Sequence, residues 1–585
     1  MRRNIKYLIT ISSIIFLLIG NPILPISSPR TIFKITKQST KINETIEGQI
    51  LFAPMDSTKT YLIDGTGTVI HIWSSDYLPG EAVRWLGNGT ILRTIKTGVE
   101  GYGGAGGGVQ KVLRDGTVTW DFRYNTNGNL SHHDILPLPN GNVLMIAWEV
   151  KTRAEAIDAG RNPNSLIDDT FMPDHIIEVK PTGPTSGVIV WEWHVWDHLI
   201  QDYDASKENY GVVDDHPELV DINYPATSGQ DWMHTNSIDY NEKFDQILIS
   251  VHNFNEIWVI DHSTTTDEAA GHNGGKSGKG GDILYRWGNP QAYRAGSSSD
   301  QKFFGQHDAT WIKTGCPGQG DILVFNNGFI RPHPEGLYSS IDEIVPPVND
   351  TGVYYLKPGS SYGPGNTIWC YTANPPINFY SGEFSGAQRL TDGNTLICDG
   401  ILGRFFEVTP NGTTIWEYTN PYPSPGLNNV FKIVYIPYQT NQKVEGIGSL
   451  CWKKVKLEET VYGSFQVQNN GAPGSFLNWR INNSAITWGS WSFSPNHGEN
   501  LTPETGPIIV YVSVIAPNEK HSSFGGGIRI DDTQNPNDFD TIPVSLTTPV
   551  DDNAYNFQWI LIKQILNVLR GWYFLFVNFY SSLMT

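Results

Sequence analysis

Short apolar runs separated by glycine-containing turns recur between residues 58 and 437. In each unit one run leads through a turn into a second run that ends in tryptophan, as in residues 60–73 (TYLIDGTGTVIHIW) and 110–120 (QKVLRDGTVTW). Runs of this length bounded by turn residues predict β-strands. The unit occurs six times, and its tryptophans, which we expect to pack within the sheets, are residues 73, 120, 191, 287, 369 and 416.

The other half of each unit is a second strand pair. Several copies have Asn-Gly or Asp-Gly in the turn, which is a hairpin signal, and three copies place a histidine ahead of the first strand, within residues 131–144, 231–250 and 303–325. Four strands in six units predict a six-bladed β-propeller over residues 50–437. Two or three β-sandwiches in series are the alternative, but they would not require this periodicity.

The pattern changes after the repeat. Residues 450–549 alternate strands and turns and predict a small immunoglobulin-like β-sandwich. Residues 555–583 are far more apolar and predict a C-terminal helix, but Lys563 and Arg570 interrupt the run of about 20 residues that a bilayer core needs. The alternatives for this tail are a helix in the membrane interface, a helix docked on the sandwich, and a contact in a homo-oligomer. The expected fold class is all-β.

Composition and the N-terminus bear on the compartment. A charged start and an apolar run make residues 1–27 a signal peptide or N-terminal anchor, so we expect an extracytoplasmic protein, secreted or at the cell surface. Seven Asn-x-Ser/Thr sequons fit a glycoprotein. Four scattered cysteines allow one or two disulfides but predict no cysteine-rich metal site. The net charge of −19 argues against nucleic acid as a partner.

The histidines are the candidate chemistry. Inner propeller strands line a central channel, so His133, His234 and His307 are expected to meet at one mouth, with Arg331 joining them from a loop. Such a group would bind a tetrahedral anion and move a phenolic proton. Other histidines (175, 198, 216 and 272) are expected to be surface or packing residues, and Arg331 has a salt bridge to Asp342 or Glu343 as its alternative. No metal and no cofactor are expected. A quinoprotein-like or metal-dependent propeller enzyme is a further alternative that His and Asp clusters allow, but no histidine pair has zinc-protease spacing and the length of the usual eight-bladed form is absent.

Several of these motifs together resemble the arylsulfotransferase family of six-bladed propellers. They are residues 231–240 (DWMHTNSIDY), 284–290 (LYRWGNP), 304–311 (FGQHDATW), Asn326-Asn327-Gly328 with Arg331, and 385–400 (SGAQRLTDGNTLICDG). The resemblance implies sulfuryl transfer from an aryl sulfate to a phenol, through a sulfated histidine and without a nucleotide donor.

By motif position the catalytic residues would be His234, His307 and Arg331, and the substrate-binding residues would be His133, Asn236, Asn327 and Ser385. Ser385 stands where the family's nucleophilic histidine is expected. Either His234 or His307 would then carry the sulfuryl group, or the site binds without turnover. The alternative function is a cell-surface binding propeller for a glycan, a peptide or a sulfated ligand.

Overall fold

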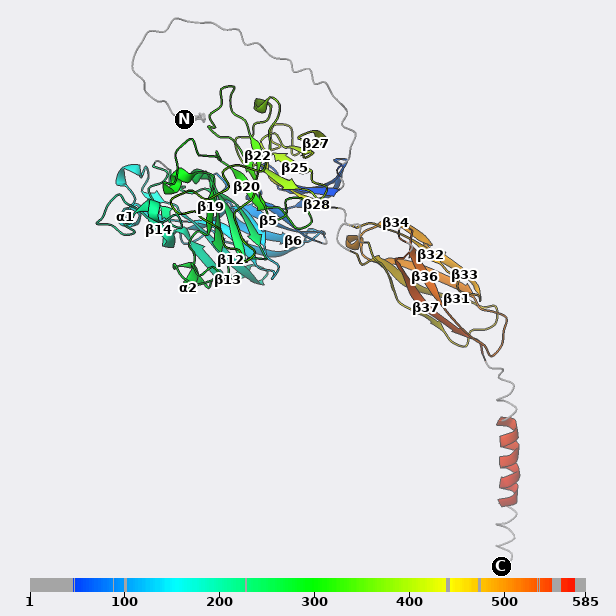
Figure 1. The fold of residues 1–585 in the computed structure, drawn as a ribbon. Coiled ribbons are helices and arrows are strands. Elements are labelled where there is room, and N and C mark those ends of the chain that lie inside the picture. Colours follow the sequence, from blue (N-terminus) through cyan, green and yellow to red (C-terminus); the bar gives the residue numbers. More distant parts are fainter. Residues whose placement is uncertain are drawn as a thin grey trace, which may run out of the picture. The chain divides into compact units, whose positions relative to one another are not determined.

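The computed structural model describes residue 46, residues 48–549 except 88, 99–102, 227–228, 438–441, 472–474, 534 and 536, and residues 559–573. Within these residues the protein is mostly β-strand, as the sequence predicts. Figure 1 shows the strands as two groups along the chain, before residue 437 and after residue 444. The predicted signal segment, residues 1–27, lies outside the described residues.

The first group forms six four-stranded antiparallel sheets, each named here with its channel-side strand first. The sheet that joins both ends of the group has β28 (Val430–Pro437), β1 (Gly48–Pro54), β2 (Lys59–Asp64) and β3 (Val69–Ser74). The next two have β4 (Val83–Gly87), β5 (Thr90–Lys96), β6 (Gly107–Val112) and β7 (Val118–Arg123), then β8 (Asn129–Pro137), β9 (Val143–Glu149), β12 (Asp174–Gly183) and β13 (Ser186–His194).

The remaining three sheets follow the simple order of the chain. They have β16 (Thr235–Asn241), β17 (Gln246–Val251), β18 (Glu256–Asp261) and β19 (Tyr285–Trp287); β20 (His307–Trp311), β21 (Ile322–Asn326), β22 (Ser340–Ile344) and β23 (Trp369–Tyr371); and β24 (Gly386–Arg389), β25 (Thr395–Asp399), β26 (Arg404–Val408) and β27 (Thr414–Thr419).

The first-named strands of the six sheets make a closed cycle. Strand β4 neighbours β8, β8 neighbours β16, and the series continues through β20, β24 and β28 back to β4. The first sheet is completed by both ends of this part of the chain, since β1 pairs with β28 in register from Gln49 with Ile436 to Phe52 with Ile433. The ring is therefore closed by backbone hydrogen bonds between distant segments.

The six repeated tryptophans form a second closed cycle. Each is on the last strand of its sheet, and its indole N–H donates a hydrogen bond of 2.7–3.1 Å to the next sheet, with acceptors Leu113 O, Ser186 O, Thr264 Oγ1, Pro364 O, Pro410 O and, from Trp416 back to the first sheet, Gly65 O. These bonds pair polar groups that packing would otherwise leave unsatisfied. The predicted packing role of the tryptophans is confirmed.

The middle strands are buried on both faces. Every residue of β17 (QILISV) and β18 (EIWVID) is buried, because sheets pack on each side of them, whereas β3 alternates between exposed residues and residues that are half-buried or, at Trp73, buried. A buried ion pair lies in this layer, where Arg286 Nη2 lies 2.5 Å from Glu256 Oε2 and neither side chain is exposed. Such a pair is tolerated only with well-formed hydrogen bonds.

Insertions carry the small elements. Helix α1 (Arg153–Asp158) begins with a capping box from Thr152 and Glu155 and lies beside the hairpin of β10 (Lys151–Thr152) and β11 (Thr170–Phe171). The segment after β13 contains the parallel pair β14 (Leu199–Ile200) and β15 (Val220–Asp221). Helix α2 (Thr266–Ala269) lies in the segment between β18 and β19.

Residues 444–547 form two sheets around a separate apolar core that includes Trp479, Val512 and Ile530. One has β29 (Val444–Ile447), β31 (Thr460–Asn469), β35 (Ile508–Ile515) and β33 (Ser490–Ser494); the other has β30 (Leu450–Trp452), β37 (Phe539–Thr547), β36 (Ser523–Asp532), β32 (Leu477–Asn482) and β34 (His497–Leu501). Residues 559–573 are helical. Among the described residues, no helix is long and apolar enough to cross a membrane. All four cysteines are free, so neither of the disulfides that the sequence allows is present.

Candidate functional site

Five of the six first-named strands share an unusual backbone feature, either within the strand or just before it. Glu81, His133, His234, Asp308 and Ser385 all have positive φ, from 49° to 116°, a region that side chains other than glycine seldom occupy. In β8, β16 and β20 the strand register also shifts at this point, as a β-bulge does. Bulges re-aim side chains. The repeated phase seen in the sequence therefore corresponds to a repeated bend in the backbone.

Four imidazoles lie in a row at this end of the strands. The ring centroids are 4.5 Å apart for His133 and His234, 5.1 Å for His234 and His252, and 5.4 Å for His252 and His307. Phe431 of β28 packs 6.0 Å from His133 and 6.4 Å from His307. The three histidines expected to converge do so, and His252 joins them.

His234 is the imidazole with a carboxylate partner. Its Nδ1 hydrogen-bonds to Asp231 Oδ2, and Trp148 Nε1 donates to Asp231 Oδ1 at 2.9 Å. Burial opposes a charge on this ring, but Asp231 outweighs burial and raises the pKa of His234. Burial likewise opposes ionisation of Asp231, whereas His234 holds the pKa of that carboxyl below its usual value. Each partner therefore favours the charged form of the other, imidazolium for His234 and carboxylate for Asp231.

The other channel imidazoles are held neutral. Burial, followed by the neighbouring imidazoles, lowers the pKa of His133 and of His307 well below the usual value, and burial and His234 lower the pKa of His252 to about 4. Bringing several imidazoles together out of water makes a charge on more than one of them unfavourable. Within the row, positive charge is thus favoured on His234 and disfavoured on the other three rings.

Hydrogen bonds fix the tautomer of His307. The Asn327 amide donates to Ser381 O at 2.8 Å and to Phe384 O at 2.7 Å, so its Oδ1 is an acceptor. His307 Nδ1 lies 2.9 Å from this Oδ1 and 3.2 Å from Gly305 O. Since both groups accept, Nδ1 carries the proton and Nε2 carries the lone pair.

His252 is arranged in the same way. The Asn253 amide donates to Asp231 O and Trp232 O, and His252 Nδ1 donates to Asn253 Oδ1 at 2.8 Å. Its Nε2 therefore also carries a lone pair. Sequence reasoning missed this residue because it follows the second strand of its sheet. It occupies the position after β17 that Asn327 occupies after β21, and the residues after the other second strands are not histidine, so the repeat gave no signal for it.

A further layer lies behind His133. His132 Nδ1 lies 2.8 Å from His133 Nδ1, His132 stacks on Trp148 with centroids 3.9 Å apart, and its Nε2 is 3.4 Å from Asp174 Oδ1. Asp174 Oδ2 accepts the backbone N–H of Thr235 at 2.8 Å, next to His234. This layer ties two of the channel histidines together.

Three of the predicted substrate-binding residues form hydrogen bonds to other groups of the protein. Asn236 is fully buried and donates to Gln306 O at 2.8 Å, and Asn327 orients His307. Ser385 is 1% exposed; its Oγ donates to Ser381 Oγ at 2.9 Å and accepts from the N–H of Gly400 at 2.9 Å. These side chains support the site from behind.

Arg331 lies apart from the imidazole row in its described contacts. Its guanidinium donates to Ser340 Oγ at 3.0 Å and stacks over Tyr338 and Phe304 at 4.4 Å and 5.6 Å from the ring centroids. The expected alternative, a salt bridge to Asp342 or Glu343, is not among its described contacts either. Within the part of the chain that the structure describes, its buried Nε has no hydrogen-bond partner.

An ionic cluster crosses the ring next to the histidines. Lys432 Nζ lies 2.6 Å from Asp134 and 3.1 Å from Asp308, and Arg84 lies 2.8 Å from Asp134. Lys432 belongs to β28, Asp134 to β8, Asp308 to β20 and Arg84 to β4. The first three are buried and Arg84 is half-buried. Charge pairing, chiefly with Arg84 and Lys432, keeps the pKa of Asp134 low despite burial. The cluster joins strands on different sides of the ring.

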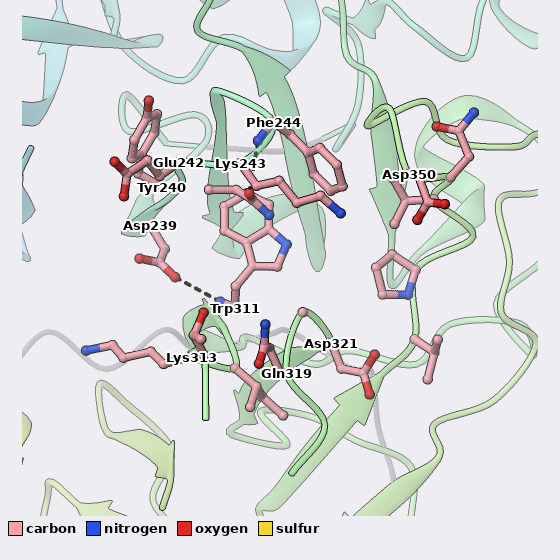
Figure 2. Close-up of a pocket in the computed structure, with 18 residues that line it drawn as sticks. Asp239, Tyr240, Glu242, Lys243, Phe244, Trp311, Lys313, Gln319, Asp321 and Asp350 are labelled. Atoms are coloured by element: carbon pink, nitrogen blue, oxygen red, sulfur yellow. Dashed lines mark hydrogen bonds between the residues drawn. The ribbon is translucent and has the colours of Figure 1, made fainter. Parts of the chain in front are cut away.

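A separate cavity of about 920 Å³ opens at the opposite end of β16 and β20. Figure 2 shows Asp239, Lys243, Phe244 and Trp311 around it, with Asp239 accepting the backbone N–H of Trp311 at 2.8 Å. None of the channel imidazoles lines this cavity. It is therefore distinct from the candidate site.

Two further groups of titratable residues were not predicted as sites from the sequence. Glu81 lies two residues before β4, where burial raises its pKa to about 7 although Lys96 and His234 act against this. Away from the channel, His198, His272 and Asp282 have ligand atoms within 4.8 Å of one another and could hold a metal ion.

Comparison with known proteins gives one family. The family model described as Arylsulfotransferase (ASST) matches residues 35–445. No curated protein matches the chain. Among solved structures, a protein of unknown function from Bacteroides caccae has 13% sequence identity and a TM-score of 0.35. The match covers 67% of this chain and 99% of the Bacteroides chain. Virginiamycin B lyase from Staphylococcus aureus has 10% identity and a TM-score of 0.29, covering 64% and 82%.

Proposed function

The chain belongs to the arylsulfotransferase family, and on that premise we propose that it moves a sulfuryl group from an aryl sulfate to a phenol at the row of channel imidazoles. The observation that carries the proposal is that the imidazoles of this row differ in pKa. The pKa of His234, which is paired with a carboxylate, is raised, whereas the pKa values of His133, His252 and His307 are lowered. Six four-stranded sheets, whose first-named strands form a closed ring, support a six-bladed β-propeller as the scaffold.

The proposed nucleophile is Nε2 of His307. A neutral imidazole with its proton fixed on the far nitrogen offers a lone pair at neutral pH, and the hydrogen bonds to Asn327 and Gly305 stabilise the charge that develops as the ring reacts. In the first half-reaction Nε2 bonds to sulfur, the bond from sulfur to the aryl oxygen breaks, and a phenol leaves. The sulfuryl group is then held on His307.

The proposed general acid and base is His234. As an imidazolium it attracts the sulfuryl oxygens and gives its proton to the departing aryl oxygen. In the second half-reaction the neutral ring takes the proton of the acceptor phenol, whose oxygen bonds to sulfur while the bond to His307 breaks. His234 and His307 return to their starting states, so protons and electrons balance over the cycle.

Arg331 enters the proposal as a second cation for the sulfuryl oxygens. A planar guanidinium suits tetrahedral oxyanions, and its buried Nε is free of a hydrogen bond to any described residue. Its described contacts are with Ser340, Tyr338 and Phe304, so this role requires that the guanidinium reach the sulfuryl group from outside the imidazole row.

We also propose that the protein works outside the cytoplasm, which N-terminal sequencing of protein recovered from the producing cells' exterior would test.

The experiment is release of p-nitrophenol from p-nitrophenyl sulfate with phenol as acceptor. His307→Asn should lower the rate at least about 100-fold, because it removes the attacking atom. His252→Asn is the matched control, an identical replacement of a neighbouring imidazole, and should retain much more of the activity. Loss only in His252→Asn would move the nucleophile to that ring. Absence of release from the wild type with any of several aryl sulfates would contradict the function itself.

A further inference from the structure

A second cluster of histidine and carboxylate lies outside the channel. His198 is at the end of the 3₁₀ turn η2 (Val195–His198), and His272 and Asp282 come from the insertion between β18 and β19. Asp282 Oδ1 lies 2.9 Å from His198 Nδ1 and 2.7 Å from His272 Nδ1. We propose that His198, His272 and Asp282 bind a divalent transition metal ion, with Zn²⁺ the best match.

The hydrogen bonds of His198 decide which of its nitrogens faces the site. Its Nε2 lies 2.8 Å from Ala269 O, and a carbonyl oxygen can only accept, so Nε2 carries the proton. In the neutral ring Nδ1 then points a lone pair at Asp282 Oδ1, which is also an acceptor. An imidazole nitrogen and a carboxylate oxygen thus converge in a buried position, together with Nδ1 of His272, as the ligands of a metal ion do.

The surroundings of His198 hold it in this orientation. The ring is fully buried and stacks on Trp193 with centroids 5.7 Å apart and planes at 7°. Trp193 in turn donates to Gly281 O at 2.7 Å, and a side chain at Gly281 would come within 2.6 Å of His198 Nε2. Metal-binding imidazoles usually donate their other N–H to a carbonyl or a carboxylate, which fixes the ring in place.

The donor set indicates the metal. Two imidazole nitrogens and one carboxylate oxygen suit Zn²⁺, which binds such atoms at about 2.0–2.2 Å in a tetrahedron. At those lengths the donors stand about 3.3 Å apart, so the two measured separations need to open by about half an ångström. His272 has a side chain 56% exposed, which leaves an entry path and room for a water molecule as fourth ligand.

The position suggests a structural role. Helix α2 and the glycine-rich residues 271–281 form a long insertion between β18 and β19. A metal ion would join two residues of this insertion, His272 and Asp282, to His198 in the segment that follows β13. Metal binding stabilises the folded state because the donors are not brought together in the unfolded chain. The ion would therefore fix the insertion against the outer strand of the preceding sheet.

The test is zinc binding by the full chain after treatment with a chelator, measured by calorimetry and by metal analysis after desalting. The wild type should retain one equivalent that His272→Ala loses, with affinity lowered by more than about 100-fold, since even second-layer changes cost 10–100-fold. His216→Ala is the matched control, because His216 is an exposed histidine 2.9 Å from Glu218 but has no third donor. It should bind zinc like the wild type.

The channel imidazoles are the competing zinc site, and His307→Asn distinguishes them. The proposal expects His307→Asn to keep the equivalent that His272→Ala loses. An equivalent lost in His307→Asn and retained in His272→Ala would overturn the proposal. So would a wild type that retains no zinc. Asp282→Asn, which keeps the shape of the side chain, should match His272→Ala if the proposal is right.

Discussion

Replacing Asp231 by asparagine tests the origin of the charge on His234. Asparagine keeps an oxygen that accepts from Trp148, so the local packing is preserved, but it removes the carboxylate that raises the pKa of His234. A hydrogen bond to a charged group contributes about 1.5–3 kcal/mol, and one pKa unit corresponds to 1.36 kcal/mol. We therefore expect the pKa of His234 to fall by about one to two units in Asp231→Asn.

The assay is the pH dependence of kcat/KM for p-nitrophenyl sulfate. If His234 must be protonated to release the phenol, activity falls as pH rises through its pKa, and this alkaline limb should move down by about one to two pH units in Asp231→Asn. Glu218→Gln, which removes the partner of the exposed His216, serves as the control and should leave the limb in place. An unchanged limb in Asp231→Asn would refute the assignment of His234 as the acid.

Stability should change with the same pair. A raised pKa of His234 contributes stability that is present below its unfolded value of about 6.5 and is lost as pH rises through the folded pKa. A lowered pKa of Asp231 contributes stability present above about 3.8 and lost as pH falls through the folded pKa. The pair therefore stabilises the fold most between these limits, and Asp231→Asn should flatten the dependence of the unfolding free energy on pH.

Three further predictions concern the scaffold, each measured by the urea midpoint and compared with the wild type. Lys432→Met leaves Asp134 with one fewer cation in the buried cluster and should destabilise by about 3–5 kcal/mol; no change would show that the cluster is not coupled to closure of the ring. Arg286→Leu leaves Glu256 buried and unpaired and should cost about 3–5 kcal/mol, most of which Arg286→Leu with Glu256→Leu should recover. Trp416→Phe removes the hydrogen bond that completes the tryptophan cycle and should cost about 1–3 kcal/mol, and a neutral result would contradict its closing role.

The repeat made much of the fold predictable. Turn signals and tryptophans at fixed positions mark each sheet; the tryptophans were expected to pack within the sheets, and the structure shows that their indole N–H groups also link consecutive sheets. The same phase placed His133, His234 and His307 at equivalent strand ends, and the rings of His133 and His234 pack 4.5 Å apart, although the two residues are separated by a hundred positions in the sequence. In a regular repeat, residues at the same position of each unit lie at the same place in each sheet, so their proximity can be predicted from the sequence.

The remaining features depend on contacts that the phase does not encode. His252 has no histidine at the equivalent positions of other units, so only the tertiary structure brings it to within 5.4 Å of His307. Arg331 lies on a loop, where the backbone path after Asn327 sets its direction toward Ser340. Ser385 lies at the equivalent strand end, but its hydroxyl donates a hydrogen bond to Ser381 and accepts one from Gly400. The pairing of His234 with Asp231 follows from a bend of the backbone at φ 54°.

The most direct test of the central claim is a mass spectrum of the protein quenched within one turnover of an aryl sulfate and digested without acid. The account predicts a peptide containing His307 whose mass is increased by one sulfuryl group, absent from His307→Asn and discharged when phenol is added before the quench. A protein that releases phenol from aryl sulfate while no channel histidine carries the added mass would contradict it.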